Sequence, residues 1–155
     1  MSRLFLGQKD IHFFDSINKE LLQQVIRQKV LYFSVSDEHT KTHRIYDEAV
    51  RKTVFAPVEI NALISYNNPV QTNNSFSIDT IYTLEAYFHV TELRERQITP
   101  REGDFIKYGN IVYEIEALTK PQQVLGLVEH EVMFKAVCRV SRNSQFKVLD
   151  EAPVI

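Results

Sequence analysis

The sequence predicts a mainly β protein: a small antiparallel β-barrel or sandwich, with one N-terminal helix packed against it and long extended loops. Several segments alternate apolar and polar residues with the period of a strand, and Gly, Pro, Asn and Asp gather between them. One segment near the N-terminus has helical spacing instead. The chain has 155 residues, which is long enough for one domain, residues 1–155, with a buried core.

The N-terminal segment has the pattern of an amphipathic helix. Residues 1–9, which precede it, are interpreted as an extended arm or a short edge strand. Asp15 or Ser16 is the expected N-cap, because either side chain can accept a hydrogen bond from a free backbone N–H, and the helix is expected to end near Gln28. An apolar stripe predicts that one helix face covers another surface: Ile17, Leu21, Leu22, Val25 and Ile26. Residues 30–35 are β-rich and predict the first strand.

Three polar segments are expected to lie outside the regular elements. Residues 36–53 are highly charged and have no sustained period, which predicts an extended loop ordered by a partner. Residues 67–77 begin with an Asn-rich run that has almost nothing to bury, and they predict a second extended loop. Residues 150–155 are expected to form a loose C-terminal tail.

Four further segments predict strands. Residues 54–66 and 131–141 alternate apolar and polar side chains, and residues 146–149 are expected to add a short edge strand. Residues 78–90 form the longest alternating run and exceed the usual strand length, so we expect this strand to bend across a barrel or to project from it. Residues 91–96 are expected to form one helical turn.

The clearest element is a stiff turn followed by a two-stranded hairpin. Pro100 restricts one backbone angle, and Gly103 and Asp104 supply a turn before the first strand. The strands 105–108 and 111–117 are joined by a Gly-Asn dipeptide, which fits a type II′ or type I′ turn.

The register of this hairpin follows from its turn. If Tyr108 pairs with Ile111, one face of the hairpin becomes a core face: Ile106, Tyr108, Ile111, Tyr113 and Ile115. The opposite face is expected to be mostly solvated: Phe105, Lys107, Val112, Glu114 and Glu116. The two acids on that face are therefore predicted to be surface groups rather than a pair for acid–base chemistry. Residues 119–123, around Pro121, are expected to form a loop.

Residue types with catalytic or metal-binding chemistry do not form a useful pattern. His39 and His43 have the i, i+4 spacing of a helix face, but the residues between them are poor helix formers and a surface loop is the better interpretation. His89 is expected on the polar side of its strand, and Cys138 on an apolar face as an inert core thiol. We therefore predict no catalytic, cofactor-binding or metal site, and no enzymatic activity.

Composition restricts the classes of function. No apolar run reaches the roughly 18 residues of a membrane span, and a formal net charge of −2 argues against a general nucleic-acid binder. The one cysteine excludes an intrachain disulfide and fits synthesis in a reducing compartment. An OB-like nucleic-acid-binding β-barrel remains an alternative, since exposed aromatic residues can stack bases. The candidates for stacking mostly fall on predicted core faces: Tyr82, Tyr87, Phe88 and Tyr113.

Two stretches taken together resemble the neck and head-closure (head completion) proteins of contractile-tailed bacteriophages. The first is Ile-Tyr-Asp-Glu-Ala at 45–49, followed by Pro-Val-Glu-Ile at 57–60. The second is Pro-x-x-Gly-Asp-Phe-Ile-x-Tyr at 100–108, followed by Tyr-Glu-Ile at 113–115. The order and spacing of these motifs carry the resemblance, which extends from the N-terminal helix to about Leu149. The family commonly has Tyr-Gly-Glu where this chain has Tyr-Asp-Glu.

The resemblance implies a virion structural protein that is made in the host cytoplasm and forms part of the head–tail neck. It implies a homo-oligomeric ring of about six or twelve copies that joins the capsid portal or adaptor to the tail and contacts another neck protein or the tail terminator. DNA would pass through the lumen without sequence-specific binding, and no membrane would be involved. The expected subunit or partner contacts are His43, Arg44, Tyr46, Glu48, Arg51, Asn73 and Asn74. The expected channel-facing acids are Glu114 and Glu116.

Overall fold

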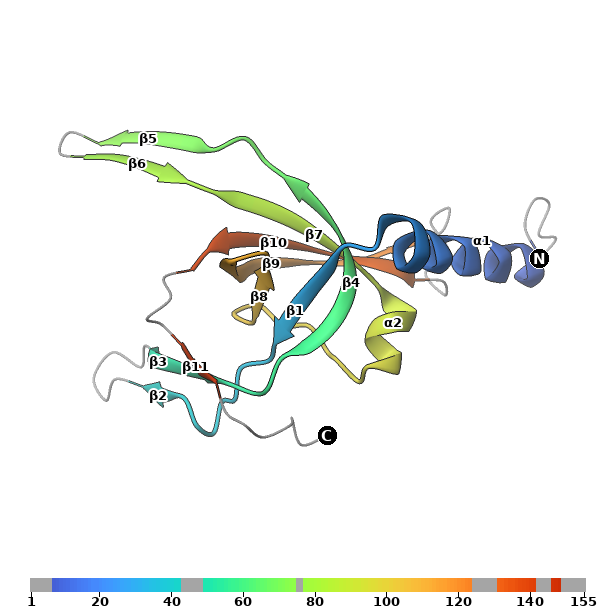
Figure 1. Cartoon of the computed structure of the whole chain (residues 1–155), viewed down its shortest axis with the longest axis horizontal. Helices are drawn as coiled ribbons and strands as arrows, with labels where there is room; N and C mark the ends of the chain where they lie inside the picture. The colour runs from blue at the N-terminus through green and yellow to red at the C-terminus, as the bar shows by residue number, and fades with distance from the viewer. Residues whose placement is uncertain (1–6, 43–48, 75–76, 124–130, 142–145, 149–155) are drawn as a thin grey trace.

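Six strands close into an antiparallel barrel in the computed structural model (Figure 1). The structure describes residues 7–42, 49–74, 77–123, 131–141 and 146–148. In order around the barrel the strands are β1 (Lys29–Phe33), β4 (Val58–Tyr66), β7 (Thr83–His89), β10 (Glu131–Val140), β9 (Ile111–Gln123) and β8 (Phe105–Tyr108). Strand β8 pairs with β1 and completes the ring. The mainly β fold is therefore confirmed, and the barrel is the correct one of the two predicted architectures.

The barrel interior holds the alternating apolar residues that the sequence pattern predicts. Buried side chains from all six strands form one core: Val30, Tyr32, Ile60, Ala62, Ile64, Leu84, Ala86, Phe88, Ile106, Tyr113, Ile115, Ala136 and Cys138. Tyr32 and Phe88 meet edge to face, with ring centroids 6.3 Å apart. Such a core supplies the apolar burial that stabilises a single domain of this size.

The N-terminal helix begins earlier than predicted. Helix α1 (Gln8–Glu20) continues directly into a π-helical segment, η1 (Leu21–Ile26), so Asp15 lies inside the helix and not at its cap. Gly7 is the N-cap, and its backbone N–H donates to Oδ2 of Asp10 at 2.9 Å. Arg27, with φ of 52°, ends the helix one residue before the predicted position. The predicted N-cap at Asp15 or Ser16 is therefore wrong, because the carboxylate of Asp10 in the first turn satisfies the N-cap backbone and no Asp or Ser side chain is needed before it.

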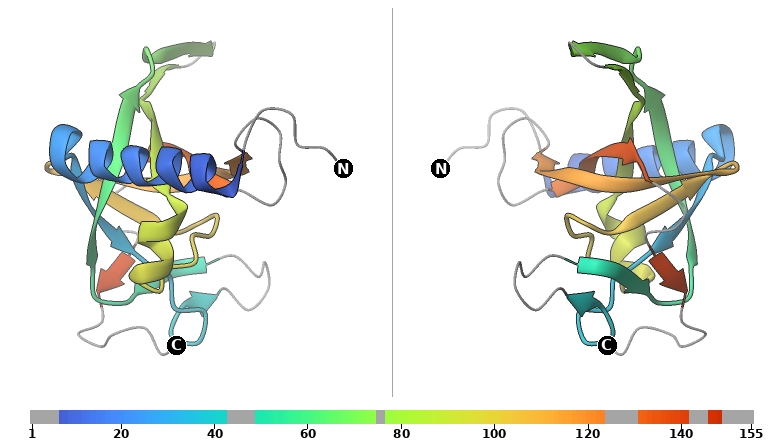
Figure 2. Two further views of the ribbon diagram at one scale, coloured as in Figure 1. Left: turned by 90° about the vertical axis from the view of Figure 1, so that its right-hand side faces the viewer. Right: turned by 90° about the vertical axis from the view of Figure 1, so that its left-hand side faces the viewer.

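Both segments that were predicted to be extended loops contain strands. Strands β2 (Lys41–Thr42) and β3 (Ala49–Val54) form a small sheet with β11 (Phe146–Val148), in the order β11-β3-β2. Strand β5 (Val70–Asn74) pairs with β6 (Ser77–Ile81) as an arm that projects from the barrel (Figures 1 and 2). Strands β2, β3 and β5 lack the apolar alternation that marks a buried strand, and backbone pairing forms them instead.

Two other predictions about strand length have different outcomes. The long run at 78–90 does project from the barrel: β6 lies in the arm and β7 in the barrel wall, with Tyr82 between them, and the predicted helical turn is α2 (Val90–Glu95). The predicted loop at 119–123 is wrong, because β9 continues through Pro121 to Gln123. The β9–β10 register shifts nearby, and such irregularities accommodate a residue that has no N–H to donate.

The predicted hairpin register is confirmed. Tyr108 lies opposite Ile111, and Ile106 lies opposite Tyr113. However, the face that was expected to be mostly solvated buries Phe105 and Val112. These two side chains form a second, smaller core with residues of β1 and β3: Phe33 and Val54. The sequence pattern could not show this core, because β3 covers the outside of the barrel here.

Candidate functional site

The Pro-x-x-Gly-Asp turn is a structural anchor. The Asp104 carboxylate is buried and accepts hydrogen bonds from the backbone N–H of Val35 at 2.9 Å and of Arg101 at 3.1 Å, and from the hydroxyl of Tyr32. Gly103 has φ of +91°, which favours glycine. Burial raises the pKa of Asp104, and the hydrogen bonds that its carboxylate accepts oppose this rise. Burial, followed by the nearby Asp104 carboxylate, raises the pKa of Tyr32. This motif therefore ties the turn to β1 and has no free group for chemistry.

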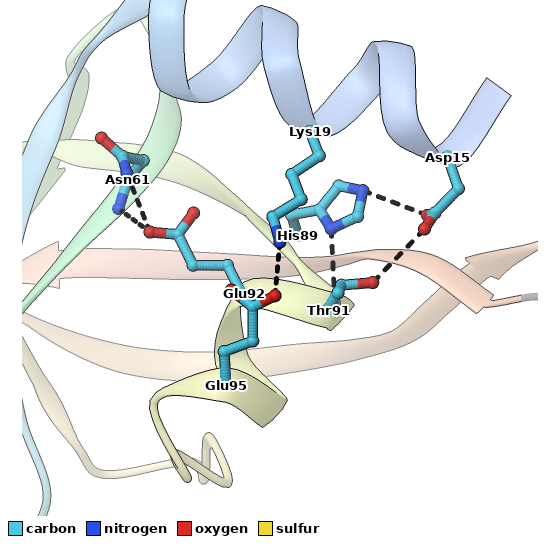
Figure 3. Close-up of polar contacts among 7 residues, drawn as sticks. All are labelled: Asp15, Lys19, Asn61, His89, Thr91, Glu92 and Glu95. Atoms are coloured by element: carbon cyan, nitrogen blue, oxygen red, sulfur yellow. Dashed lines mark hydrogen bonds and ion pairs between the residues drawn. The ribbon is translucent and has the colours of Figure 1, made fainter. Parts of the chain in front are cut away.

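A polar cluster holds the two helices on the barrel (Figure 3). His89 was expected on a polar strand face but is completely buried. Its Nδ1 accepts a hydrogen bond from the backbone N–H of Thr91 at 3.3 Å, so the proton of the neutral ring lies on Nε2. Nε2 lies 3.2 Å from Oδ1 of Asp15, and the Thr91 hydroxyl donates to Oδ2 of Asp15 at 3.4 Å. Burial lowers the pKa of His89, which keeps the ring neutral.

Glu92 and an ion pair complete this clamp between α1, α2 and β4. Oε1 of the buried Glu92 carboxylate accepts from the backbone N–H and the side-chain amide of Asn61, at 3.0 Å and 2.8 Å. Oε2 is buried and has no hydrogen-bond partner in the described part of the chain. Lys19 of α1 forms an ion pair with Glu95 of α2.

The cluster resembles a His–Asp dyad, but its geometry does not activate a nucleophile. The Thr91 hydroxyl hydrogen-bonds to Asp15 rather than to the imidazole, so the histidine does not activate this hydroxyl.

Protonation of His89 is expected to destabilise the protein. The pKa of His89 in the folded state lies below its usual 6.5, so the unfolded state binds more protons as the pH falls below 6.5. The free energy of unfolding should fall with pH in this range by up to about 1.4 kcal/mol per unit, and His89→Gln should remove that dependence. Urea unfolding between pH 8 and pH 5, with the exposed His12→Gln as control, measures it. An unchanged pH slope in His89→Gln would contradict this assignment.

One apolar surface lies on the helix. The predicted stripe is mostly exposed rather than covered: of its members only Leu22 is fully buried, and Ile11 is the other buried helix residue. The exposed side chains share one side of α1 and η1, and we call them the helix face: Phe13 (61% exposed), Phe14 (49%), Ile17 (42%), Leu21 (44%) and Val25 (70%). The two phenylalanines precede the predicted helix start at Asp15 or Ser16, so the predicted stripe did not include them.

A second apolar surface is a hollow where the arm joins the barrel. A cavity of about 370 Å³ opens there, and we call it the tyrosine pocket: Tyr66, Asn67, Tyr82, Thr83, Ile111, Tyr113 and Val140. Tyr66 and Tyr82 are 64% and 58% exposed. Tyr66 also packs against Tyr108 with ring centroids 6.1 Å apart. Since aromatic side chains around a dry hollow are typical of contact sites, this pocket is a candidate docking surface.

The predicted contact residues lie in several places. His43, Arg44, Tyr46 and Glu48 lie outside the described residues. Arg51 is an exposed residue of β3, and Asn73 is an exposed residue of the arm strand β5, which also contains Asn74. The structure does not bring Arg51 together with the arm, because the small sheet and the arm lie on different sides of the barrel (Figure 2).

The two acids that were expected to face a channel each lie beside a cation. Glu114 forms an ion pair with Lys52 of β3, and its side chain is only 31% exposed. Lys52 also donates to the carbonyl of Gly103 at 3.1 Å. Glu116 lies 3.5 Å from Arg139 of β10. A neighbouring cation reduces the repulsion that a carboxylate exerts on DNA phosphates, so these acids are weak candidates for a repulsive lining.

Three observations concern other kinds of site. Cys138 is buried as expected, and burial raises its pKa to about 12. In the described residues no group of three or more His, Cys, Asp or Glu side chains is arranged to hold a metal ion. No helix in this part of the chain has the length and apolar character needed to cross a membrane. Comparison of the sequence with protein-family models and with curated proteins gives no match.

Proposed function

We propose that this protein is a subunit of a homo-oligomeric ring in the neck of a tailed bacteriophage virion, where it joins the portal or adaptor to the tail around the DNA. The observation that carries the proposal is the presence of two different exposed apolar surfaces on one barrel: the helix face and the tyrosine pocket. The motif resemblance to neck and head-closure proteins supplies the location. Adaptor, head-closure and tail-terminator layers are all compatible with it.

Two unlike surfaces on one molecule suit a ring. In a cyclic assembly with more than two members, each copy contributes one patch to one neighbour and a different patch to the other. Helix α1 and the arm extend from the barrel in different directions (Figures 1 and 2). A convex helix face on one copy can therefore fill the hollow beside the arm of the next copy, and the contact repeats around the ring.

The exposed area is sufficient for such a contact. Side chains of this size that are about half exposed present roughly 100 Å² each, so the helix face offers roughly 500 Å² of mostly apolar surface. A stable interface buries about 800 Å² on each partner, and its outer part is polar. The helix face is thus large enough to be the apolar centre of one side of the contact.

The double variant Ile17→Asp/Val25→Asp is expected to abolish ring assembly. Each substitution removes the burial of an aliphatic side chain and adds a charge that the interface must desolvate, so we expect assembly to weaken at least a hundredfold. Analytical ultracentrifugation of the purified protein, alone and with the portal or tail-completion proteins of the same phage, measures it. The control Gln8→Asp adds a charge to an exposed position of α1 that has no member of the helix face three, four or seven residues away, and it should assemble normally.

Phage genetics tests the location of the ring. Loss of this polypeptide should give DNA-filled heads that lack tails. Infectious particles without the polypeptide would overturn the proposal.

The alternative of an OB-like nucleic-acid-binding module has less support. OB-folds are five-stranded barrels, whereas this barrel closes with six strands. Of the four aromatic residues that were candidates for base stacking, Phe88 and Tyr113 are buried in the core and only Tyr82 is largely exposed. The strand number and the burial of these rings therefore give no support to base stacking on this barrel.

A further inference from the structure

A groove on the small β11-β3-β2 sheet gathers positively charged side chains. It encloses about 270 Å³, and we call it the basic groove: His39, Lys41, Arg51, Thr53 and Lys147. Lys41 lies opposite Arg51 in the β2–β3 pair, and Lys147 lies opposite Thr53 in the β11–β3 pair. Arg51 and Thr53 are two residues apart in β3, so their side chains point to the same face. Two consecutive strands, β2 and β3, and the distant strand β11 therefore place three cations around one hollow.

These cations have no compensating charge among the described residues. No described carboxylate lines the groove or forms an ion pair with Lys41, Arg51 or Lys147, all of which are exposed. Four other lysines of the chain do pair with acids: Lys19, Lys29, Lys52 and Lys135. The chain as a whole has a formal net charge of −2, so this cluster is a local feature and not a consequence of a basic composition.

Buried packing and hydrogen bonds fix the position of β3, the central strand of the basic groove. Val54, which follows Thr53 in β3, is completely buried in the second core against the barrel. The Thr53 hydroxyl donates to the carbonyl of His39 at 2.9 Å, and the backbone N–H of Thr53 donates to the Thr40 hydroxyl at 3.3 Å. Because the strand is anchored to a buried core, the backbone that carries Arg51 is in place before any ligand arrives, which lowers the entropic cost of binding.

The chemistry of the groove fits phosphate. An arginine guanidinium pairs with two phosphate oxygens at once, and lysine ammonium groups add point charges around the same group. Lysine and arginine contact phosphate oxygens whatever the sequence, and none of the described lining residues is a carboxylate or an amide, so the groove suits the sugar–phosphate backbone. We propose that the basic groove binds phosphates of the double-stranded DNA backbone.

This inference rests on the proposed function, since a ring around DNA presents one groove from every subunit. It makes the small sheet the DNA-facing part of the subunit, in place of Glu114 and Glu116. Each subunit neutralises only a few phosphates and binds weakly at physiological salt, so DNA can still move. Several grooves acting together in a ring would hold the DNA more firmly than one subunit can.

DNA-binding measurements over a series of salt concentrations test the groove. We compare the wild-type protein with Lys41→Gln/Arg51→Gln/Lys147→Gln, using fluorescence anisotropy of a short duplex of mixed sequence, and circular dichroism to check folding. Wild-type binding should be independent of sequence and weaken with salt. The groove variant should bind at least tenfold more weakly at low salt, and the slope of log K against log salt should fall by about 0.9 for each lost phosphate contact.

A matched control separates a local site from net charge. Lys9→Gln/Arg96→Gln/Lys107→Gln removes the same number of positive charges elsewhere on the barrel and helices and should bind like the wild type. The charge-preserving variant Lys41→Arg/Lys147→Arg should also retain binding. Equal loss in the groove and control variants would overturn the proposal. So would binding of inorganic phosphate or an acidic peptide without binding of duplex DNA.

Ring assembly of the same samples distinguishes the two proposals. If the protein assembles but does not bind DNA through the groove, the inference fails and the proposed function stands. If groove-dependent DNA binding occurs in a protein that never assembles, the proposed function fails and the groove remains a DNA site.

Discussion

Asp104→Ala is expected to lower the free energy of unfolding by about 3 to 4 kcal/mol, since buried donors that lose their acceptor each cost about 1 to 3 kcal/mol. The substitution removes the acceptor of two backbone N–H groups and of the buried Tyr32 hydroxyl at once. Asp104→Asn should recover only part of the loss, because an amide presents one acceptor oxygen and turns a donor toward the other N–H groups. Urea denaturation at neutral pH measures both variants.

Two controls locate this effect in the buried network. Tyr32→Phe removes one of the three donors and should cost about 1 to 2 kcal/mol, because the carboxylate keeps its two backbone partners. Asp37→Asn removes an acid whose contact with Arg101 is largely exposed, and it should change stability by less than about 0.5 kcal/mol. A loss below 1 kcal/mol for Asp104→Ala, within the range of surface substitutions, would show that the turn does not depend on this carboxylate.

Phe105→Ala is expected to cost about 3 to 5 kcal/mol, the usual range for deleting a fully buried aromatic side chain. Phe105 lies on the outer barrel face and fills the centre of the second core, between Phe33 of β1 and Val54 of β3. Lys52 lies over its ring, 5.2 Å from the centroid, while it pairs with Glu114. The deletion should therefore loosen β3, the central strand of the basic groove, in addition to destabilising the barrel.

Hydrogen exchange and denaturation together test the second core. Amide protection in β3 should fall more than protection in β7, whose buried side chains belong to the main core and not to the core of Phe105. The control is Ile111→Ala on the same hairpin, where the side chain is 48% exposed and the expected cost is below about 1 kcal/mol. A cost for Phe105→Ala as small as that of the control would mean that the outer face of the hairpin is solvated, as the sequence pattern predicts.

The local parts of the fold could be predicted from the sequence. The β8–β9 hairpin follows from a strand period of two and a Gly-Asn turn, so its register needs no distant contact. The barrel strands β4, β7 and β10 follow from alternation that persists over their lengths. Burial of Cys138 follows in the same way from its place in β10.

Other features depend on contacts between distant residues. Strands β2, β3 and β5 are ordered by backbone pairing within the small sheet and the arm, and polar sequence with no alternation is also typical of loops. His89 alternates onto the outer face of its strand, yet α1 and α2 cover that face and bury it. The helix stripe shows the reverse case, because the same pattern that predicts a covered face leaves Ile17, Leu21 and Val25 exposed.

The sequence by itself determined the fold class, the hairpin and its register, because these depend on the period of side chains and the chemistry of turns within a few residues. Only the tertiary structure decided which surfaces are available for function. It buried Phe105 on the outer side of the barrel and left the helix face exposed. It also brought Lys41, Arg51 and Lys147 from three strands into one groove. The physical reason is that burial and electrostatic potential depend on distance in space, and residues far apart in the chain become neighbours only when the barrel closes.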